Sequence, residues 1–303
     1  MSTDSPSIKI PRLHPQFCSP LADVILVSTD DTGFRVPHFT LRNTCGHFRK
    51  LLSPGASSNS RIIRRELVVD DEQQEKQIST IHVEEADTPL VKFLSLICGL
   101  PTDGWESLEE LENVLSLSQR WDAPGPISVI RSAITAPVFL AEALRLYDIT
   151  SRMGWEEEAS IASIRTLGLN LYDEEHRPDL ERMTSCHLMK LFKLHRERRD
   201  KFKILIDSDE LFTIGNSTSA TCPGCGEQMN NGPWRELKVR MFLELDRRPL
   251  GDMLGSLDME EWPEAIACWE AKCAKADCER LNYSRLATLR DINHCVSLLP
   301  SHV

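Results

Sequence analysis

The sequence lacks any long apolar run and any export signal, and both absences narrow the class of protein. No stretch of the chain approaches the ~18 consecutive apolar residues that a membrane-spanning helix needs. The N-terminal segment lacks the basic start and apolar stretch of a secretion signal. We therefore expect a protein of the cytoplasm or nucleus that is not secreted. Its 10 cysteines are then expected to be reduced thiols or metal ligands.

The chain also lacks an excess of positive charge. Lys and Arg number 35 and Asp and Glu number 46, which gives a formal net charge of -11. A chain this acidic has no global attraction for nucleic acid or for an anionic membrane. The locally basic stretch at 195–203 is typical of the solvated face of a helix, with Glu197 and Lys201 at i,i+4 spacing. Neither nucleic acid nor a membrane is expected as a partner.

Several enzyme motifs are missing as well. The phosphate-binding patterns G-x-G-x-x-G and G-x-x-x-x-G-K-[ST] do not occur. The metalloprotease pattern H-E-x-x-H and the hydrolase pattern G-x-S-x-G are absent too. Since no sequence feature points to a catalytic site, we expect a protein that is not an enzyme and has no catalytic residues.

Length and composition predict a globular chain of about two domains. The 41% hydrophobic and 27% charged residues are ordinary for a fold that buries a core without disulfides. Short β-branched runs followed by helical periodicity predict the α+β class. The predicted parts are a flexible arm (1–20), a mixed domain (21–135) with a polar insert (53–78), a helical region (136–206), a cysteine-containing loop (207–232) and a helical C-terminal region (233–303).

Within the mixed domain, strand signals come first and helical spacing follows. A turn cluster at 30–33 joins two β-branched segments, which predicts a hairpin. The insert is expected to be a long loop with a short strand at 62–63 or 67–69. The predicted strands are 22–27, 34–36 and 78–83, and the predicted helical segments are 37–52 with a break at Cys45-Gly46, 87–99, a helix capped by Ser107, and 127–136 after a break at 124–126.

Six short segments of this domain stand in a distinctive order. They are Ala22-Asp23-Val24, Phe34-Arg35-Val36, Leu41, Thr44-Cys45-Gly46-His47-Phe48, Ile81-His82-Val83 and Trp121-Asp122. In this order and spacing they resemble the BTB/POZ family. The matching motif positions are Asp23, Phe34, His38, Leu41 and Phe48. The chain departs from the family at Pro37, where a histidine often stands. The later stretch 146–159 resembles the long BTB proteins that are common in basidiomycete fungi.

This resemblance implies protein–protein association. BTB domains commonly form homodimers and recruit partners, including the cullin scaffolds of ubiquitin ligases. We therefore expect a non-enzymatic interaction module that dimerises or recruits protein partners through this domain, with a homodimer as the expected assembly. A substrate adaptor of a cullin-based ubiquitin ligase is the alternative. Such adaptors often carry a hydrophobic-x-Glu motif after the helix of Phe48, but Glu66, Glu72 and Glu75 have no apolar residue two positions earlier.

Asp23 has two interpretations. It can be a polar anchor at a dimer or partner surface, or a structural carboxylate bonded to local backbone or to an arginine. A single aspartate beside an apolar strand is more often structural, because a carboxylate at a buried position needs hydrogen-bond partners. We favour the structural role.

The strongest chemical motif is Cys222-Pro223-Gly224-Cys225-Gly226. Two thiolates two residues apart on a Pro/Gly turn can form one edge of a tetrahedral zinc site. Candidates for the other edge are Cys268, Cys273, Cys278, His294 and Cys295. Of these we assign Cys273 and Cys278, which would lie ~140° apart on a straight helix and converge only across a helix end or loop.

The four predicted ligands, Cys222, Cys225, Cys273 and Cys278, would make a zinc-stabilised binding module. A redox-sensitive pair and inert thiols are the alternatives. The segment His195-Arg196-Glu197 upstream has the first half of a zinc deaminase pattern. Pro223 lies inside the cysteine pair rather than before it, which argues against that enzyme.

Overall fold

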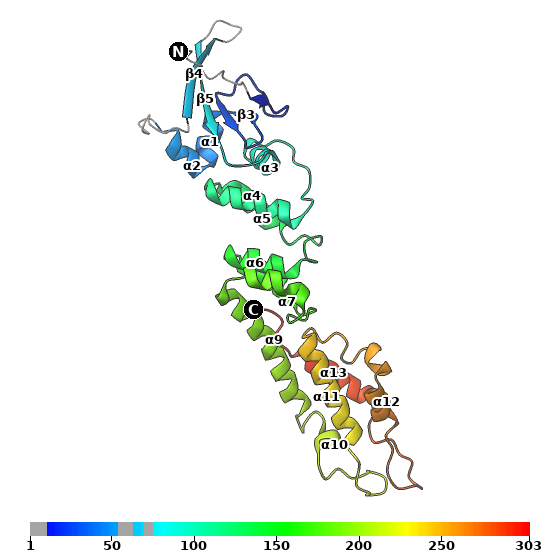
Figure 1. Ribbon diagram of the computed structural model, residues 1–303. Coiled ribbons are helices and arrows are strands. Elements are labelled where there is room, and N and C mark those ends of the chain that lie inside the picture. The colour runs from blue at the N-terminus through cyan, green and yellow to red at the C-terminus, as the bar shows by residue number, and fades with distance from the viewer. Residues whose placement is uncertain (1–10, 54–62, 70–74) are drawn as a thin grey trace, which may run out of the picture. The chain divides into compact units, whose positions relative to one another are not determined.

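The protein is described by a computed structural model that covers residues 11–53, 63–69 and 75–303 (Figure 1). Its helices and strands make it a mixed α+β protein, which confirms the predicted class. The chain divides into two compact units, Met1–Ala136 and Pro137–Val303. In the part of the chain that the structure covers, no helix combines the length and apolar character needed to cross a membrane.

The first unit holds a five-stranded mixed sheet centred on β2. The strands are β1 (Arg12–Leu13), β2 (Val24–Val27), β3 (Thr32–Val36), β4 (Ile63–Val69) and β5 (Glu75–His82), in the order β1-β3-β2-β5-β4. Strands β2 and β3 pair antiparallel with Val24 opposite Val36, which confirms the predicted hairpin. On its other edge β2 pairs parallel with β5, with Val24 opposite Ser79.

The helices of this unit begin and end where the local sequence dictates. They are α1 (His38–Thr44), α2 (Gly46–Leu51), α3 (Asp87–Cys98), α4 (Leu108–Arg120) and α5 (Pro124–Ala133). Cys45 separates α1 from α2, as predicted. Gly99 ends α3 in the left-handed conformation with φ of 67°, which favours glycine. The hydroxyl of Ser107 accepts the Glu110 amide at 3.1 Å and caps α4.

Aromatic side chains hold the helices of this unit together. Phe48 on α2 and Phe93 on α3 each meet the Trp121 ring edge-on, with centroids 4.9 and 5.0 Å apart. All three residues are buried. Edge-to-face pairs of this kind stabilise a core beyond the area they bury. Trp121 is therefore the point at which α2 and α3 meet the end of α4.

The five residues that carry the sequence resemblance lie in or beside the helices and strands of the first unit. The Asp23 carboxylate accepts the backbone N–H of His38 at 2.7 Å, at the first residue of α1. This is a bond to local backbone, and it satisfies one of the amides left open at a helix start. Phe34, Leu41 and Phe48 are buried, and His38 is half-buried.

Two expectations for this unit need correction. Residues 11–20 are not a free arm, because β1 pairs with β3 and the buried Phe17 ring lies 5.7 Å from that of Phe34. Residues 1–10 of that arm lie outside the described residues. The insert is not only a loop, because β4 and β5 form an antiparallel hairpin across it. Of the residues tested for the adaptor motif, Glu72 lies outside the described residues, and Glu66 and Glu75 lie on β4 and β5.

A third correction concerns the segment 124–126. Its two prolines do not break the chain ahead of a helix, because α5 begins at Pro124 itself. Proline fits the first turn of a helix, where its missing N–H would have had no partner. The same rule explains Pro263, which is the first residue of α12.

The second unit is almost entirely helical. Its elements are α6 (Ala143–Arg152), α7 (Glu156–Thr166), η1 (Glu174–His176), α8 (Arg177–Arg182), α9 (Ser185–Ile206), α10 (Thr213–Asn216), α11 (Gly232–Arg247), η2 (Asp258–Glu261), α12 (Pro263–Glu270) and α13 (Arg285–Ser297). Thr184 caps α9 by accepting the amide of His187 at 3.4 Å. Helix α9 runs alongside α11 and α13 (Figure 1).

The long helix α9 carries two buried polar side chains. The Arg198 guanidinium donates to the carbonyl of Pro249 at 2.6 Å, to that of Leu250 at 2.9 Å and to that of Pro300. It thereby ties α9 to the turn after α11 and to the C-terminal residues. His195 lies 3.2 Å from the Thr166 hydroxyl, and its burial, together with the charge of Arg198, lowers its pKa to about 4. His195 therefore has a structural environment and lies outside the cysteine cluster.

The C-terminal region differs from its prediction at residues 271–284. This stretch was expected to be helical, but α12 ends at Glu270 and α13 begins at Arg285. The segment Lys272–Leu281 instead folds back on itself, with Lys272 bridged to Leu281 as in an antiparallel pair. This non-helical turn supplies the condition under which Cys273 and Cys278 can converge.

Candidate metal centre

Four cysteines from two distant turns meet at one place in the second unit. The Sγ atoms of Cys222, Cys225, Cys273 and Cys278 all lie within 4.8 Å of one another. Cys222 Sγ lies 3.7 Å from Cys278 Sγ, and Cys225 Sγ lies 3.4 Å from Cys273 Sγ. The structure thus brings together all four of the ligands predicted from the sequence. The two turns that carry them lie at the same end of the unit (Figure 1).

The first turn, called here knuckle 1, spans residues 221–228. Thr221 and Gln228 are bridged as an antiparallel pair, and the Cys222 amide donates to the carbonyl of Glu227 at 2.8 Å. The Gly226 amide donates back to the carbonyl of Cys222 at 2.9 Å. Gly226 has φ of 76°, which a residue with a side chain rarely adopts, so the glycine after Cys225 lets the chain turn back.

The second turn, called here knuckle 2, spans residues 272–281 and repeats this layout. The Cys273 amide donates to the carbonyl of Arg280 at 2.9 Å, and the Cys278 amide donates to that of Lys275 at 2.9 Å. Glu279, directly after the second cysteine, has φ of 44°. Each knuckle thus presents two cysteines and reverses the chain just after the second of them.

Backbone amides point at the sulfurs. The amides of Gly224 and then of Cys225 donate to Cys222 and lower the pKa of its thiol to about 6. The amide of Lys275 lowers the pKa of Cys273, but desolvation and the neighbouring thiols outweigh it and raise that pKa to about 12. The Arg280 amide donates to Cys278, whose pKa is nevertheless raised by the thiols of Cys222 and Cys225. Four thiols packed this closely favour one shared negative charge, which a divalent cation would relieve.

The spacing of the sulfurs fits a tetrahedral zinc ion. Thiolates about 2.3 Å from a tetrahedral zinc lie about 3.8 Å from one another. The sulfur separations of 3.4 and 3.7 Å across the knuckles, with all four within 4.8 Å, match that arrangement closely. Amide donors to the sulfurs would orient the ligands and share the charge of a four-thiolate site.

The other candidate ligands of the sequence lie elsewhere. Cys268 and Cys295 are fully buried in the hydrophobic core of the second unit, among the helices α11, α12 and α13. Burial raises the pKa of Cys268 to about 12 and, with the charge of Asp291, that of Cys295 to about 11. His294, on α13, is not part of the cluster either. These residues therefore behave as core or surface side chains rather than as ligands.

The knuckles have little apolar packing of their own. Their buried cluster contains Cys222, Met229 and Cys273, and it is distinct from the core of the second unit. One polar link joins the segments beside them: the Tyr283 hydroxyl donates to Asn231 Oδ1 at 2.9 Å. Because this small buried cluster contains no aromatic side chain, we expect the sulfur cluster itself to hold the two knuckles together.

Sequence reasoning did not find the groups that support the sulfurs. The Arg280 side chain lies over Gly224, where a β-carbon would come within 3.2 Å of its Nη1 atom. Glycine at 224 therefore leaves room for the positively charged guanidinium of Arg280, from knuckle 2, beside the cysteines of knuckle 1. The signal in the sequence is the concentration of charged residues at 274–280 (Lys275, Asp277, Glu279 and Arg280) without a helical spacing of large apolar residues.

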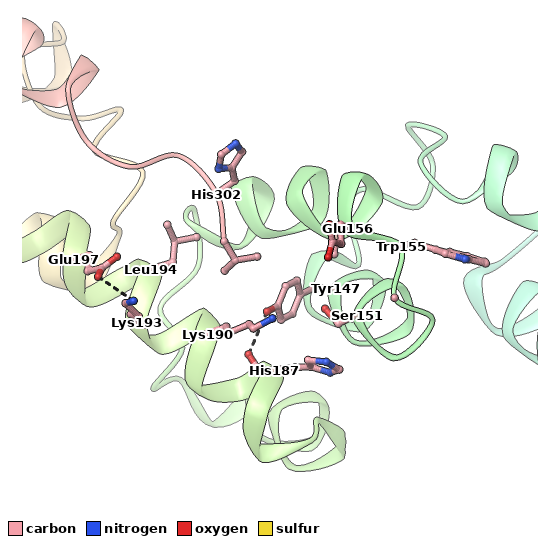
Figure 2. A pocket seen from close by; sticks show the side chains of 13 residues that line it. Tyr147, Ser151, Trp155, Glu156, His187, Lys190, Lys193, Leu194, Glu197 and His302 are labelled. Atoms are coloured by element: carbon pink, nitrogen blue, oxygen red, sulfur yellow. Dashed lines mark hydrogen bonds and ion pairs between the residues drawn. The ribbon is translucent and has the colours of Figure 1, made fainter.

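A cavity of about 530 Å³ is a separate feature of the second unit. Figure 2 shows it between α9 on one side and α6 with the start of α7 on the other. The Tyr147 hydroxyl, from α6, donates to the carbonyl of His187 at 3.1 Å. Lys190 and Lys193 line the cavity together with two acidic residues, Glu156 and Glu197, and Lys193 Nζ lies 3.6 Å from Glu197 Oε1, so this mixed lining selects no class of ligand.

The chain matches no family model and no curated protein.

Proposed function

We propose that the four cysteines bind one zinc ion that stabilises the second unit. The observation that carries this proposal is the convergence of four sulfurs, from knuckles 48 to 56 residues apart in sequence, within 4.8 Å. Four cysteine ligands complete the coordination of zinc and leave no open position for a substrate. The role that this arrangement supports is thus structural.

Metal analysis tests this role directly. The full-length chain, purified under reducing conditions with zinc supplied, is expected to hold one zinc per chain. Cys225→Ser removes one ligand and is expected to lower the zinc content severalfold. Cys186→Ser makes the same chemical change at an exposed cysteine of the same unit that is outside the cluster, and it should leave the stoichiometry unchanged. Zinc well below one per chain in the unsubstituted protein would refute the proposal.

For the whole chain we propose protein association through the first unit. Support comes from the order of its elements: the β2–β3 hairpin, α1 and α2, the parallel strand β5 beside β2, and then α3 to α5. That order agrees with the BTB/POZ resemblance, which implies homodimers. Two large apolar side chains flank the hairpin and face solvent: Leu21 is 81% exposed and Phe39 is 74% exposed. A second copy covering this part of the unit would remove both from water.

Sedimentation of the full-length protein measures this association. We expect a dimer that weakens when Phe39 is replaced by Asp, because a carboxylate at an apolar interface loses its hydration. Ile204→Asp, at an exposed apolar residue of α9, is the matched control and should leave the dimer intact. A monomer at every concentration, or an equal effect of the two substitutions, contradicts homodimerisation through this surface.

A further inference from the structure

We infer that the four-cysteine centre is a peroxide-sensitive latch, in which oxidation releases zinc and links knuckle 1 to knuckle 2 by two disulfides. This inference rests on the proposed zinc site and adds a mode of regulation to it. The pairs defined by the geometry are Cys222 with Cys278 and Cys225 with Cys273, whose sulfurs lie 3.7 and 3.4 Å apart. Each pair joins one knuckle to the other.

Accessibility divides each pair in the same way. Cys225 and Cys278 are partly exposed, whereas Cys222 and Cys273 are buried. Each cross-knuckle pair therefore combines one sulfur that an oxidant in solution can reach with one that is shielded from it. The partly exposed sulfur is oxidised first, and its buried partner, 3.4 or 3.7 Å away, is close enough to resolve the product.

The chemistry balances with hydrogen peroxide as the oxidant. An exposed thiolate attacks one peroxide oxygen, the O–O bond breaks, and the sulfur becomes a sulfenic acid while hydroxide leaves and takes up a proton. The buried thiolate of the pair then attacks that sulfur, an S–S bond forms, and a second hydroxide leaves as water. For both pairs, four thiolates, two peroxides and four protons give two disulfides and four waters. The zinc ion leaves because its ligands are consumed.

The layout distinguishes this centre from the remaining buried cysteines of the unit. Cys268 and Cys295 are fully buried in the core, so a peroxide in solution can reach neither sulfur. The oxidised knuckles stay joined, because both bonds run between them. Oxidation would thus replace the zinc cross-link by disulfides. A thiol reductant together with zinc would restore the zinc-bound form.

The test uses the full-length, zinc-loaded chain. Its two exposed cysteines outside the centre are replaced, as Cys18→Ser and Cys186→Ser. Hydrogen peroxide is added in a titration, and the zinc released is measured by the absorbance of a chromogenic chelator. We expect one zinc released for two peroxides, complete recovery after a thiol reductant and zinc, and a product that has lost four hydrogens in mass.

Tryptic mapping then shows whether the bonds run between the knuckles or within them. Trypsin cuts after Lys203 and Arg235, so both cysteines of knuckle 1 lie in one peptide, 204–235. It also cuts after Lys272, Lys275 and Arg280, so Cys273 and Cys278 lie in separate peptides, 273–275 and 276–280. Cross-knuckle bonds attach both short peptides to 204–235. A bond within each knuckle instead joins the two short peptides to each other and leaves 204–235 unattached, which would overturn the inference.

The outcomes separate this inference from the zinc proposal. Absence of zinc from the reduced protein refutes the zinc site itself. Zinc that is bound at one per chain but is retained under peroxide overturns only the latch. Zinc that is lost with sulfinic or sulfonic acids in place of disulfides also overturns the latch, because the buried sulfurs would then have failed to resolve the oxidised ones.

Discussion

Cys225 Sγ lies 3.4 Å from Cys273 Sγ, although 48 residues of chain separate the two cysteines. Helices α11 and α12 lie between them in sequence, so the contact closes a loop around half of the second unit's core. A cross-link that closes a long loop stabilises the fold mainly by restricting the unfolded chain. The centre is therefore expected to matter both for the local turns and for the helices it encloses.

Removal of zinc is expected to loosen the knuckles before the helices. With a strong chelator, the hydrogen-bonded amides of Cys222, Cys273 and Asn282 should exchange with deuterium about tenfold faster or more, where each factor of ten corresponds to about 1.4 kcal/mol of local stability. Peptides from the middle of α9 should change far less, because they lie against the core rather than the sulfur cluster. Hydrogen exchange with mass spectrometry measures both. Equal acceleration throughout the unit would contradict a local role.

Phe48 is expected to be a main support of the first unit. Phe48→Ala removes a ring that is 1% exposed and lies edge-on to Trp121, so it should cost about 3–5 kcal/mol of unfolding free energy. Phe39→Ala makes the same change at an exposed position and should cost under about 1 kcal/mol. Urea unfolding of the two variants gives the comparison. Similar losses in both would mean that Phe48 is not the core residue described above.

The planar guanidinium of Arg198 is expected to matter for stability by its geometry as well as by its charge, because it donates to three carbonyls at once. Lysine at this position cannot donate in three directions from a planar group, so Arg198→Lys should leave buried carbonyls of Pro249, Leu250 or Pro300 without a donor. We expect a loss of about 2–3 kcal/mol in unfolding free energy. Arg196→Lys, on the exposed face of the same helix, should change it little. A neutral Arg198→Lys variant would rule out this anchoring role.

His195 is expected to make the second unit acid-sensitive. Its folded-state pKa of about 4 lies below the ordinary value of 6.5, so the unfolded chain takes up the proton first as pH falls. The stability from keeping this histidine neutral is thus complete above pH 6.5 and is lost as pH falls from 6.5 towards 4, by about 3 kcal/mol in total.

The measurement compares urea unfolding of the unsubstituted protein with His195→Gln across this pH range. Zinc release at low pH acts on both proteins alike, so the difference between them isolates the histidine. The difference in unfolding free energy should narrow on acidification. A difference independent of pH would mean that His195 is protonated as easily in the folded protein as in the unfolded chain.

Local signals in the sequence were enough for much of the first unit. Gly99 and the Ser107 cap fix helix ends through contacts within a few residues, and the hairpin of β2 and β3 follows from its turn. The strand at 78–83 was predicted and corresponds to β5, but its parallel pairing with β2 was not, because that pairing depends on residues far apart in sequence. Pro124 was misread because the same residue type both ends and begins helices.

For the centre, Cys222 and Cys225 were evident from their spacing, whereas Cys273 and Cys278 depended on a turn that no motif announces. The backbone amides that donate to the sulfurs could not be predicted from the sequence. Every residue except proline has a backbone N–H, so residue type does not show which of them lie beside a sulfur. Arg280 over Gly224 could not be foreseen either, since the two residues belong to different knuckles.

The position of β2 between β3 and β5 also sets the order in which the sheet can assemble. Val24 finds Val36 across a short turn, but it finds Ser79 only after about fifty residues of chain have been brought together. The β2–β3 hairpin is thus expected to form first, and β5 then pairs with the free edge of β2. The parallel pairing should therefore be absent early in folding. In a cell, the nascent hairpin would wait with one edge open until β5 had left the ribosome.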